Sequence, residues 1–415
     1  MLKKTLALFL GLMMILSLVA CTGNSTEGAV KIEFLNLNIE EADIFEKIVS
    51  DFNTSQSEVM VKLVTPPDEN VLAIRIQNND SPDVFNEWFG QAVFDYVDSG
   101  YVRDLSDSFL LSRIDPAILT DTAYNGKNYM IPITKNFMGI YYNVDIFQDN
   151  NLAIPATLDE LWAVCDTLNE KGITPFAAGY KDGWNLAHWG QNIIGNTIPD
   201  YPRVFKEIFN GDLKGVDING ISDFADVIIK VASYVQPDVL GTDTEASINE
   251  FVNGQTAMTI NGSWNIPLID SVSGDDFNYA IFPFPTNDAE TMRVMSGADY
   301  SFLLSSKSSS EKQIATEKFV SYILDVGIEY YVEQTNAPSC VIGIDANTSK
   351  YELINNILEQ GRIFSMPNSG RWTDETYLSY TVAMQNFVAS GDKEKFYQEF
   401  EESLTVSGIP RTFID

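Results

Sequence analysis

The sequence predicts an α/β protein built from two lobes. Its 415 residues are more than one ordinary hydrophobic core holds, and 45% of them are hydrophobic, which is enough for two cores. Over residues 30–88, short segments rich in β-formers alternate with amphipathic helical segments. This alternation is typical of parallel β-α-β units, so each lobe is expected to be a mostly parallel sheet flanked by helices.

The first lobe begins with a strand at residues 30–38, where hydrophobic side chains recur at every second position. A helix is predicted over residues 40–53, because its apolar side chains share one helical face. These side chains are Ile44, Phe45, Ile48, Val49 and Phe52. A strand, a helix and a short strand follow at residues 59–66, 69–79 and 81–88.

Polar and aromatic side chains follow two of these strands. Parallel sheets place ligand-binding residues where the strands end. Asn38 and Glu40 follow the first strand, and Asn86, Glu87 and Trp88 end the third. These positions are predicted to face a ligand.

Residues 124–143 interrupt the alternation. Asn125-Gly126 is a strong hairpin-turn signal, and Pro132 marks an irregular point between two predicted strands. The segment is therefore expected to leave one lobe and enter the other. Lys135 and Asn136 lie at this crossover, where either a hinge role or a ligand-binding role is plausible.

The second half of the chain is predicted to be rich in helices. Residues 157–172 form a well-signalled helix, with Thr157 as its N-cap and Gly172 at its end. Residues 292–305 are expected to form a strand broken at 296–299. Further helices are predicted at residues 221–235, 244–254, 309–327, 351–361, 374–390 and 393–404, and strands at 255–260 and 277–287.

The composition excludes several classes of function. The formal net charge of -32 would repel the phosphates of nucleic acids and the surface of anionic lipids. The chain has one histidine, His188, so a His-rich metal site is excluded and a catalytic triad would have to use that residue. His188 is more often expected to be a structural hydrogen-bonding residue than a ligand contact. No cofactor is expected.

The N-terminal residues have the pattern of a secretion signal. Lys3 and Lys4 precede an apolar stretch that ends at Ala20 and is too short to span a membrane comfortably as a helix. Leu18-Val19-Ala20-Cys21 resembles the bacterial lipoprotein signal of aliphatic, variable, small and Cys residues. Residues 1–20 would then be removed, Cys21 would carry the lipid (palmitate), and residues 21–29 would form a flexible tether. This predicts a protein anchored on the extracellular face of the cytoplasmic membrane, as in Gram-positive bacteria.

Two cysteines remain, Cys165 and Cys340. A disulfide between them is chemically possible outside the cell, and two free buried thiols are the alternative.

Four segments resemble the extracellular solute-binding proteins of ABC importers, in the sugar-binding class that includes maltose-binding protein. They are SPDVF at 81–85, GKNYMIPITKNFMGIYYN at 126–143, NGQTAMTINGSWN at 253–265, and residues 296–324, which begin SGADYSFLLS. Each motif is weak alone, but their order and spacing are specific. One departure is Gly297-Ala298, where the family commonly has two glycines.

The resemblance implies a type II periplasmic-binding-protein-like fold with a ligand cleft at the hinge. One lobe would comprise residues 30–135 and 295–337, and the other residues 136–294 and 338–415. The lobes would close over the ligand and present it to the permease subunits of an ABC transporter. The protein is expected to be a monomer and to catalyse no reaction.

A sugar site needs flat aromatic faces and fixed carboxylates or amides, and the sequence gathers both at predicted loop ends. Five of the six tryptophans lie in such stretches; Trp162 and Trp189 are expected in the core. The predicted ligand-binding residues are Asn38, Glu40, Glu87, Trp88, Asn136, Asp182, Trp184, Trp264, Asp299, Tyr300, Arg371 and Trp372.

Two other functions stay open. A glycosidase could use a pair of carboxylates, but no pair stands out by motif. A binding protein for a peptide, a polyamine or iron is the other alternative, and the acidic charge would suit a cationic cargo.

Overall fold

The computed structural model describes residues 28–39, 41–67, 70–274, 277–368 and 372–406. Its residues cluster into two units. The described part of the first unit covers residues 28–85 and Leu304–Ile323, and the second covers Asn86–Leu303 and the chain from Leu324 onward. The lobe boundaries predicted from the sequence stay a prediction.

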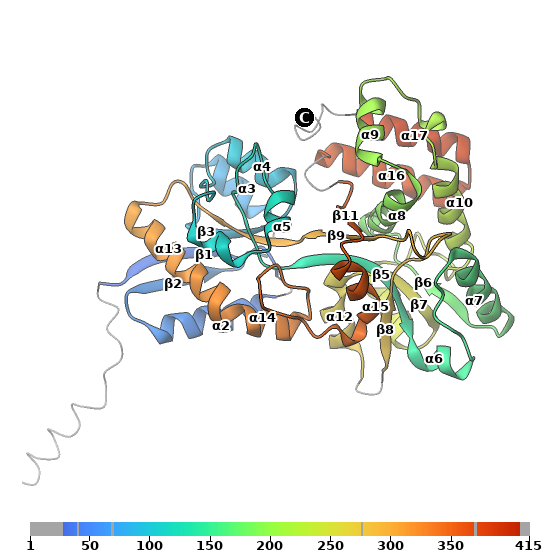
Figure 1. The fold of residues 1–415 in the computed structure, drawn as a ribbon, viewed down its shortest axis with the longest axis horizontal. Helices are drawn as coiled ribbons and strands as arrows, with labels where there is room; N and C mark the ends of the chain where they lie inside the picture. Colours follow the sequence, from blue (N-terminus) through green and yellow to red (C-terminus); the bar gives the residue numbers. More distant parts are fainter. Residues whose placement is uncertain (1–27, 40, 68–69, 275–276, 369–371, 407–415) are drawn as a thin grey trace, which may run out of the picture. The chain divides into compact units, whose positions relative to one another are not determined.

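The first unit contains the predicted β-α-β units (Figure 1). β1 pairs in parallel with β2, from Val30↔Val59 to Leu35↔Val64, and in parallel with the start of β3. The side chains of α2 that face this sheet are Phe45, Ile48, Val49 and Phe52, four of the five predicted. The elements are β1 (Val30–Leu35), α2 (Ala42–Ser55), β2 (Val59–Val64), α3 (Val71–Gln77), β3 (Val84–Trp88) and α13 (Ser310–Tyr322).

A mixed sheet forms the centre of the second unit. Among the described residues its strand order is β11-β9-β5-β7-β6, and β8 also pairs with β5. β5 pairs antiparallel with β7, β8 and β9, whereas β6–β7 and β9–β11 are parallel. The α/β fold class is confirmed, but this sheet is less parallel than expected. The strands of this sheet are β5 (Lys135–Asn143), β6 (Thr174–Ala177), β7 (Thr256–Gly262), β8 (Tyr279–Phe282), β9 (Val294–Ala298) and β11 (Ile363–Phe364). β4 (Ile131–Pro132) and β10 (Tyr300–Leu304) lie outside it and pair antiparallel with each other.

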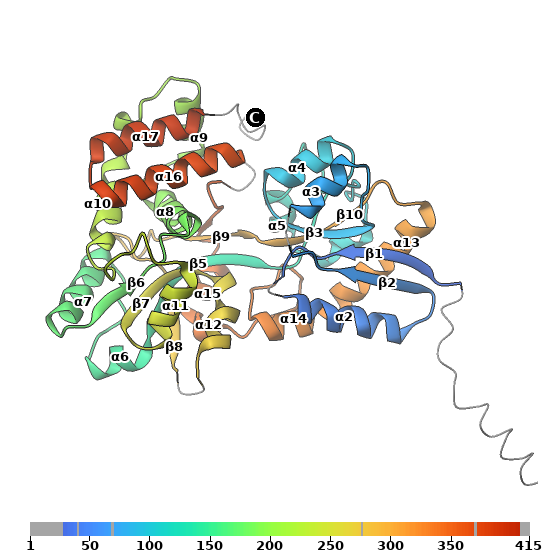
Figure 2. The same ribbon diagram turned by 180° about the vertical axis from the view of Figure 1, so that it is seen from behind.

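Helices cover this sheet and build a second layer beside it. α16 packs against α17 and against α8, as both views show (Figures 1 and 2). The α-helices assigned to the second unit are α4 (Gln91–Asp98), α5 (Pro116–Asp121), α6 (Val144–Asp149), α7 (Leu158–Glu170), α8 (Gly183–Thr197), α9 (Tyr201–Phe209), α10 (Ile221–Ala232), α11 (Thr244–Val252), α12 (Ile266–Val272), α14 (Ile328–Thr335), α15 (Glu352–Glu359), α16 (Asp374–Ser390) and α17 (Lys393–Thr405), not all of which contact the sheet. None of the helices in the described residues is long and apolar enough to cross a membrane.

Local signals explain several element boundaries. The Thr157 side chain accepts a hydrogen bond from the Glu160 N–H at the start of α7, as its sequence position predicts. Asn125 and Gly126 form the predicted turn, and both have positive φ. The two strands expected beside this turn are not formed there; a single antiparallel bridge joins Tyr124 to Lys127. The predicted strand at 292–305 is interrupted at Asp299 alone, between β9 and β10, and not over the whole of residues 296–299.

Candidate functional site

Two groups of predicted ligand-binding residues meet at the start of β5. Asn136 pairs with Gly297 of β9, two residues before Asp299. The next residue, Phe137, donates its backbone N–H to the Ser263 side chain across 3.2 Å, directly before Trp264. The start of β5 therefore contacts two other segments of the second unit. One carries Asp299 and is called the acidic group below; the other carries Trp264 and belongs to the aromatic group.

The acidic group centres on the short link between β9 and β10. The Asp299 N–H donates to the Thr134 carbonyl at 3.0 Å, and the Asp299 carbonyl accepts from the Phe89 N–H at 3.1 Å. Beside it, the rings of Trp88 and Tyr300 meet edge to face with centroids 5.3 Å apart. Both backbone groups of Asp299 are thus hydrogen-bonded, which holds the main chain from which its side chain projects.

The Asp299 carboxyl is half-buried, and its environment disfavours ionisation. Burial raises the pKa of Asp299 to about 6, and a hydrogen bond from the Asn136 side chain opposes that rise. A carboxylate with one fixed amide partner still has free acceptor positions. It could therefore accept hydrogen bonds from neighbouring hydroxyls of a ligand.

The aromatic group comprises Trp184, His188, Trp264 and Tyr377, all half-buried. The His188 ring is the centre of the group. Its centroid lies 5.7 Å from that of Trp184, 5.4 Å from that of Trp264 and 5.8 Å from that of Tyr377. These side chains come from α8, from the turn Ser263–Asn265 after β7, and from α16. Partly exposed rings from three segments provide the kind of surface on which an apolar ring face can stack.

The start of α8 positions Trp184. The sequence stretch around Trp184 was expected to be a loop end, but α8 begins at Gly183 and places Trp184 in its first turn. Asp182, the residue before the helix, accepts a hydrogen bond from the Thr244 N–H at 2.8 Å. A Cβ atom at Gly183 would lie 2.3 Å from a methyl carbon of Thr381, so glycine lets α8 approach α16 closely.

Buried amides lie behind the aromatic group. The Asn261 side-chain oxygen accepts from the side-chain amides of Asn185, at 3.1 Å, and Asn265, at 2.8 Å. The Asn261 amide in turn donates to the Thr259 hydroxyl at 3.0 Å. This network ties α8 to the end of β7 and holds the Trp184 and Trp264 segments in one arrangement.

The other predicted residues have different surroundings. Asn38 lies in the first unit, where its side chain accepts from the Glu41 N–H. Glu87 is half-buried beside Trp88, which is 37% exposed. Tyr300 and Trp372 are buried, at 2% and 4% exposure, and Trp372 packs in the main hydrophobic core. Glu40 and Arg371 lie outside the described residues, as does Cys21.

Sequence reasoning placed Tyr377 only in a predicted helix and treated His188 as structural. No motif marks either of them, because their contact joins residues 189 positions apart. Trp189 is 1% exposed and in the core as expected, and Trp162 packs partly buried against that core.

Cys165 and Cys340 are both buried and unpaired, so the structure has the free-thiol alternative. Burial raises the pKa of both thiols well above its usual range. Among the described residues, no group of three or more His, Cys, Asp or Glu side chains could hold a metal ion.

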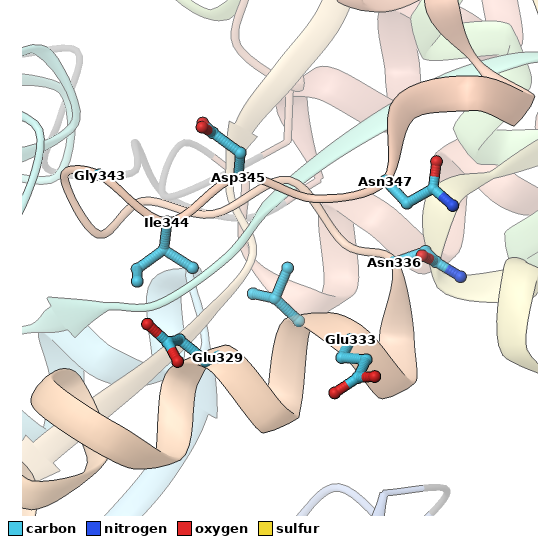
Figure 3. Close-up of a pocket in the computed structure, with 8 residues that line it drawn as sticks. Glu329, Glu333, Asn336, Gly343, Ile344, Asp345 and Asn347 are labelled. Carbon is cyan, nitrogen blue, oxygen red and sulfur yellow. The ribbon is translucent and has the colours of Figure 1, made fainter.

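A separate pocket of about 540 Å³ lies between α14 and residues 343–347 (Figure 3). Three carboxylates line it, from Glu329, Glu333 and Asp345, together with two amides from Asn336 and Asn347. It contains none of the predicted ligand-binding residues, so its acidic lining is a distinct feature of the second unit.

The model of one protein family, described as bacterial extracellular solute-binding protein, matches residues 47–327, more than half of the chain. The chain belongs to this family. The motifs around β3, β5 and β7 that suggested it all lie inside the matched region.

Two curated relatives align with most of this solute-binding protein. The multiple sugar-binding protein of Streptococcus mutans is 27% identical over 348 residues, which cover 79% of this chain and 80% of the relative. The melibiose/raffinose/stachyose-binding protein MelE of Bacillus subtilis is 23% identical over 360 residues, with 83% of each chain covered.

Solved structures share the fold. RafE of Streptococcus pneumoniae in its apo form has a TM-score of 0.80 at 23% identity, covering 93% of this chain and 99% of RafE. RafE in complex with raffinose also has a TM-score of 0.80, and covers 91% of this chain. At this identity the likeness establishes the two-domain solute-binding fold, which confirms the fold expected from the resemblance.

Proposed function

We propose that this solute-binding protein captures a sugar or oligosaccharide outside the cell and delivers it, without chemical change, to the permease of an ABC importer. The aromatic group of Trp184, His188, Trp264 and Tyr377 carries this proposal. Partly exposed indole and phenol rings can stack on the apolar faces of a sugar ring, which few other small polar solutes possess.

The acidic group supplies the polar half of such a site. Asp299 offers carboxylate oxygens to sugar hydroxyls, with Asn136 beside it. We propose these residues as ligand contacts together with the predicted positions Asn38, Glu40, Glu87, Trp88, Asp182 and Arg371. Tyr300 and Trp372 were also predicted as contacts, but both are buried, so we propose that they support the site by packing. The names of the relatives agree, since they bind melibiose, raffinose, stachyose or multiple sugars.

The predicted lobes are part of the proposal. Residues 30–135 with 295–337, and residues 136–294 with 338–415, would act as two bodies that close over the ligand. Closure would signal to the permease that ligand is bound, and a ligand favours the closed form only through its higher affinity for that form. The protein would act as a monomer.

The anchor belongs to the same proposal. Lipid on Cys21 and the tether of residues 21–29 would hold the protein at the extracellular face of the cytoplasmic membrane. A protein held there meets its permease at a raised effective concentration.

A thermal-shift screen tests the proposed cargo. At a hundredfold excess over its Kd, a bound sugar should stabilise the protein by about 2.7 kcal/mol. Melibiose, raffinose and stachyose are the first sugars to test, with peptides and polyamines in the same plate. Stabilisation by peptides or polyamines alone would contradict the proposal that the ligand is a sugar. Sugar products detected after incubation with the protein would contradict the proposal that it binds sugar without catalysing a reaction.

A pair of tryptophan variants tests the site. Trp264→Ala should weaken binding of the sugar at least tenfold while changing the unfolding free energy less. Trp162→Ala is the matched control, because Trp162 is also half-buried but stacks on Tyr234 away from the aromatic group. Equal effects of the two variants on binding would contradict the assigned site.

A cationic cargo such as a polyamine is the second candidate. The pocket lined by Glu329, Glu333 and Asp345 favours it, because its carboxylates would attract ammonium groups. Spermidine that stabilises the protein, and loses this effect in Glu333→Gln, would support this candidate over the sugar.

A further inference from the structure

His188 is the only histidine of the chain, and it touches three aromatic rings from three segments. Trp184 lies four residues before it, so both side chains share one face of α8. Trp264 and Tyr377 come from distant parts of the sequence. Removing the imidazole would therefore leave Trp184 and Trp264 without their common neighbour.

The polar contacts of the ring restrict its orientation. The Nε2 atom lies 3.1 Å from the Tyr377 hydroxyl oxygen, which makes a hydrogen bond. The Nδ1 atom is buried and has no hydrogen-bond partner. A ring held by one hydrogen bond and by three aromatic contacts has little freedom to flip.

The same contacts favour one tautomer. A neutral imidazole carries one N–H, and a buried N–H without an acceptor is rarer in proteins than an unpaired acceptor. The proton is therefore placed on Nε2, where it is donated to Tyr377. Burial lowers the pKa of His188 to about 4, so the ring is neutral at ordinary pH.

We infer that His188 is a positioning residue of the sugar site, which holds the Trp184 and Trp264 rings in the arrangement that stacks on the ligand. This inference rests on the proposed function. A neutral imidazole suits the role, because it packs between apolar rings without the cost of burying a charge. Tyr377 serves the same arrangement by fixing the imidazole from α16.

Two replacements separate packing from hydrogen bonding. His188→Phe keeps a flat ring among the aromatic neighbours and removes the bond to Tyr377. His188→Gln places an amide N–H where Nε2 lies and removes the ring. Both should weaken binding of the sugar found in the screen about tenfold, whereas Trp184→Ala and Trp264→Ala should weaken it further.

Tyr377→Phe removes the same hydrogen bond from the other side and should weaken binding less than His188→Phe. Tyr234→Phe is the matched control. Tyr234 likewise has a ring contact, stacking on Trp162 with centroids 6.0 Å apart, and a hydroxyl hydrogen bond, donated to Asp166 at 2.6 Å, but it lies outside the aromatic group. The control should bind sugar with the wild-type Kd.

NMR of the sole imidazole gives a readout that a purely structural residue would not move. In protein without a histidine tag, the ¹⁵N shifts should show the Nε2–H tautomer, and saturating sugar should shift the imidazole signals. Wild-type Kd values for both His188 variants, with imidazole signals unmoved by sugar, would overturn the inference. If no sugar binds the wild type, the proposed function fails instead, and the tautomer measurement still tests the geometry.

Discussion

The backbone N–H of Phe137 donates a hydrogen bond to the side-chain oxygen of Ser263 across 3.2 Å. Both residues are buried, and the bond joins the start of β5 to the turn that carries Trp264. Together with the pairing of β5 with β7 and β9, this bond links the backbone of the aromatic group to that of the acidic group.

Replacing Ser263 by alanine leaves the Phe137 N–H without this acceptor. A buried donor that loses its partner costs about 1–3 kcal/mol, so Ser263→Ala should lower the unfolding free energy by that amount. Urea denaturation measures the change. Ser271→Ala is the control, because the Ser271 hydroxyl bonds Leu268 at an exposed position, and a loss for Ser263→Ala as small as for the control would contradict the role of the contact.

Gly262→Ala should displace the Trp264 ring. A Cβ atom at Gly262 would lie 2.3 Å from the Trp264 ring carbons, so the ring has to move. The backbone is not the obstacle, since Gly262 has φ -91 and ψ 163, which alanine adopts readily. We expect sugar affinity to fall at least tenfold by calorimetry. Gly274→Ala, where a Cβ atom would meet nothing within 4 Å, should keep wild-type affinity.

Asp299 should make stability depend on pH in an unusual direction. Because burial raises its pKa from 3.8 to about 6, the unfolded chain loses this proton first, and stability falls as pH rises through that window. The difference in unfolding free energy between Asp299→Asn and the wild type should therefore shift in favour of the variant as pH rises from about 4 to about 6. Above about pH 6 this difference should stay constant.

Sugar binding should show the opposite trend. The ionised carboxylate accepts hydrogen bonds at both oxygens, and these bonds are stronger than those to the neutral acid, so the affinity for sugar should drop as pH falls below about 6 in the wild type. Urea melts and calorimetry over this range measure both effects. A stability difference between wild type and Asp299→Asn that does not vary with pH would contradict the assignment.

The two buried thiols should not react in the native protein. Cys165 and Cys340 are enclosed and their pKa values are raised, so neither offers an accessible thiolate to Ellman's reagent. In a Cys21→Ser chain, we expect no reaction before unfolding and two thiols after it. Rapid release of the thionitrobenzoate ion from folded protein would show that at least one of the two thiols is accessible, which would contradict this prediction.

Cys21 should carry the lipid. Mass spectrometry of the mature protein from its own membrane should find a diacylglyceryl group on an N-terminal Cys21, and Cys21→Ser should move the protein into the medium. A mature N-terminus at another residue would refute this processing.

The β-α-β units of the first unit could be predicted from the sequence because their signals are local. The alternation at 30–38 and the face of Phe45, Ile48 and Phe52 each follow from a period of two or of 3.6 residues. The prediction for β5 was weaker, since a strand buried on both faces has no alternation. All of its residues except Lys135 are buried, and its three partner strands come from later in the chain.

The site was predicted only where residue type was a sufficient signal. Trp184 and Trp264 were chosen because tryptophan beside turn residues suits a sugar, and the structure brings both against one imidazole. Tyr377 could not be chosen, because its helix pattern resembles that of any packed helix. Trp372 has the same residue type as Trp184 but packs into the core, a difference that arises from tertiary packing.

The pairing of β5 has a consequence for how this protein tolerates change. Its partners fix the strand on both sides, from Asn136↔Gly297 to Asn143↔Tyr279. Inserting one residue inside the strand would turn every later side chain to the opposite face, so Asn136 and Tyr142 could not both keep their places. Length variation should therefore be found in the connecting turns, and a sensor or tag inserted into this protein belongs there rather than within residues 135–143.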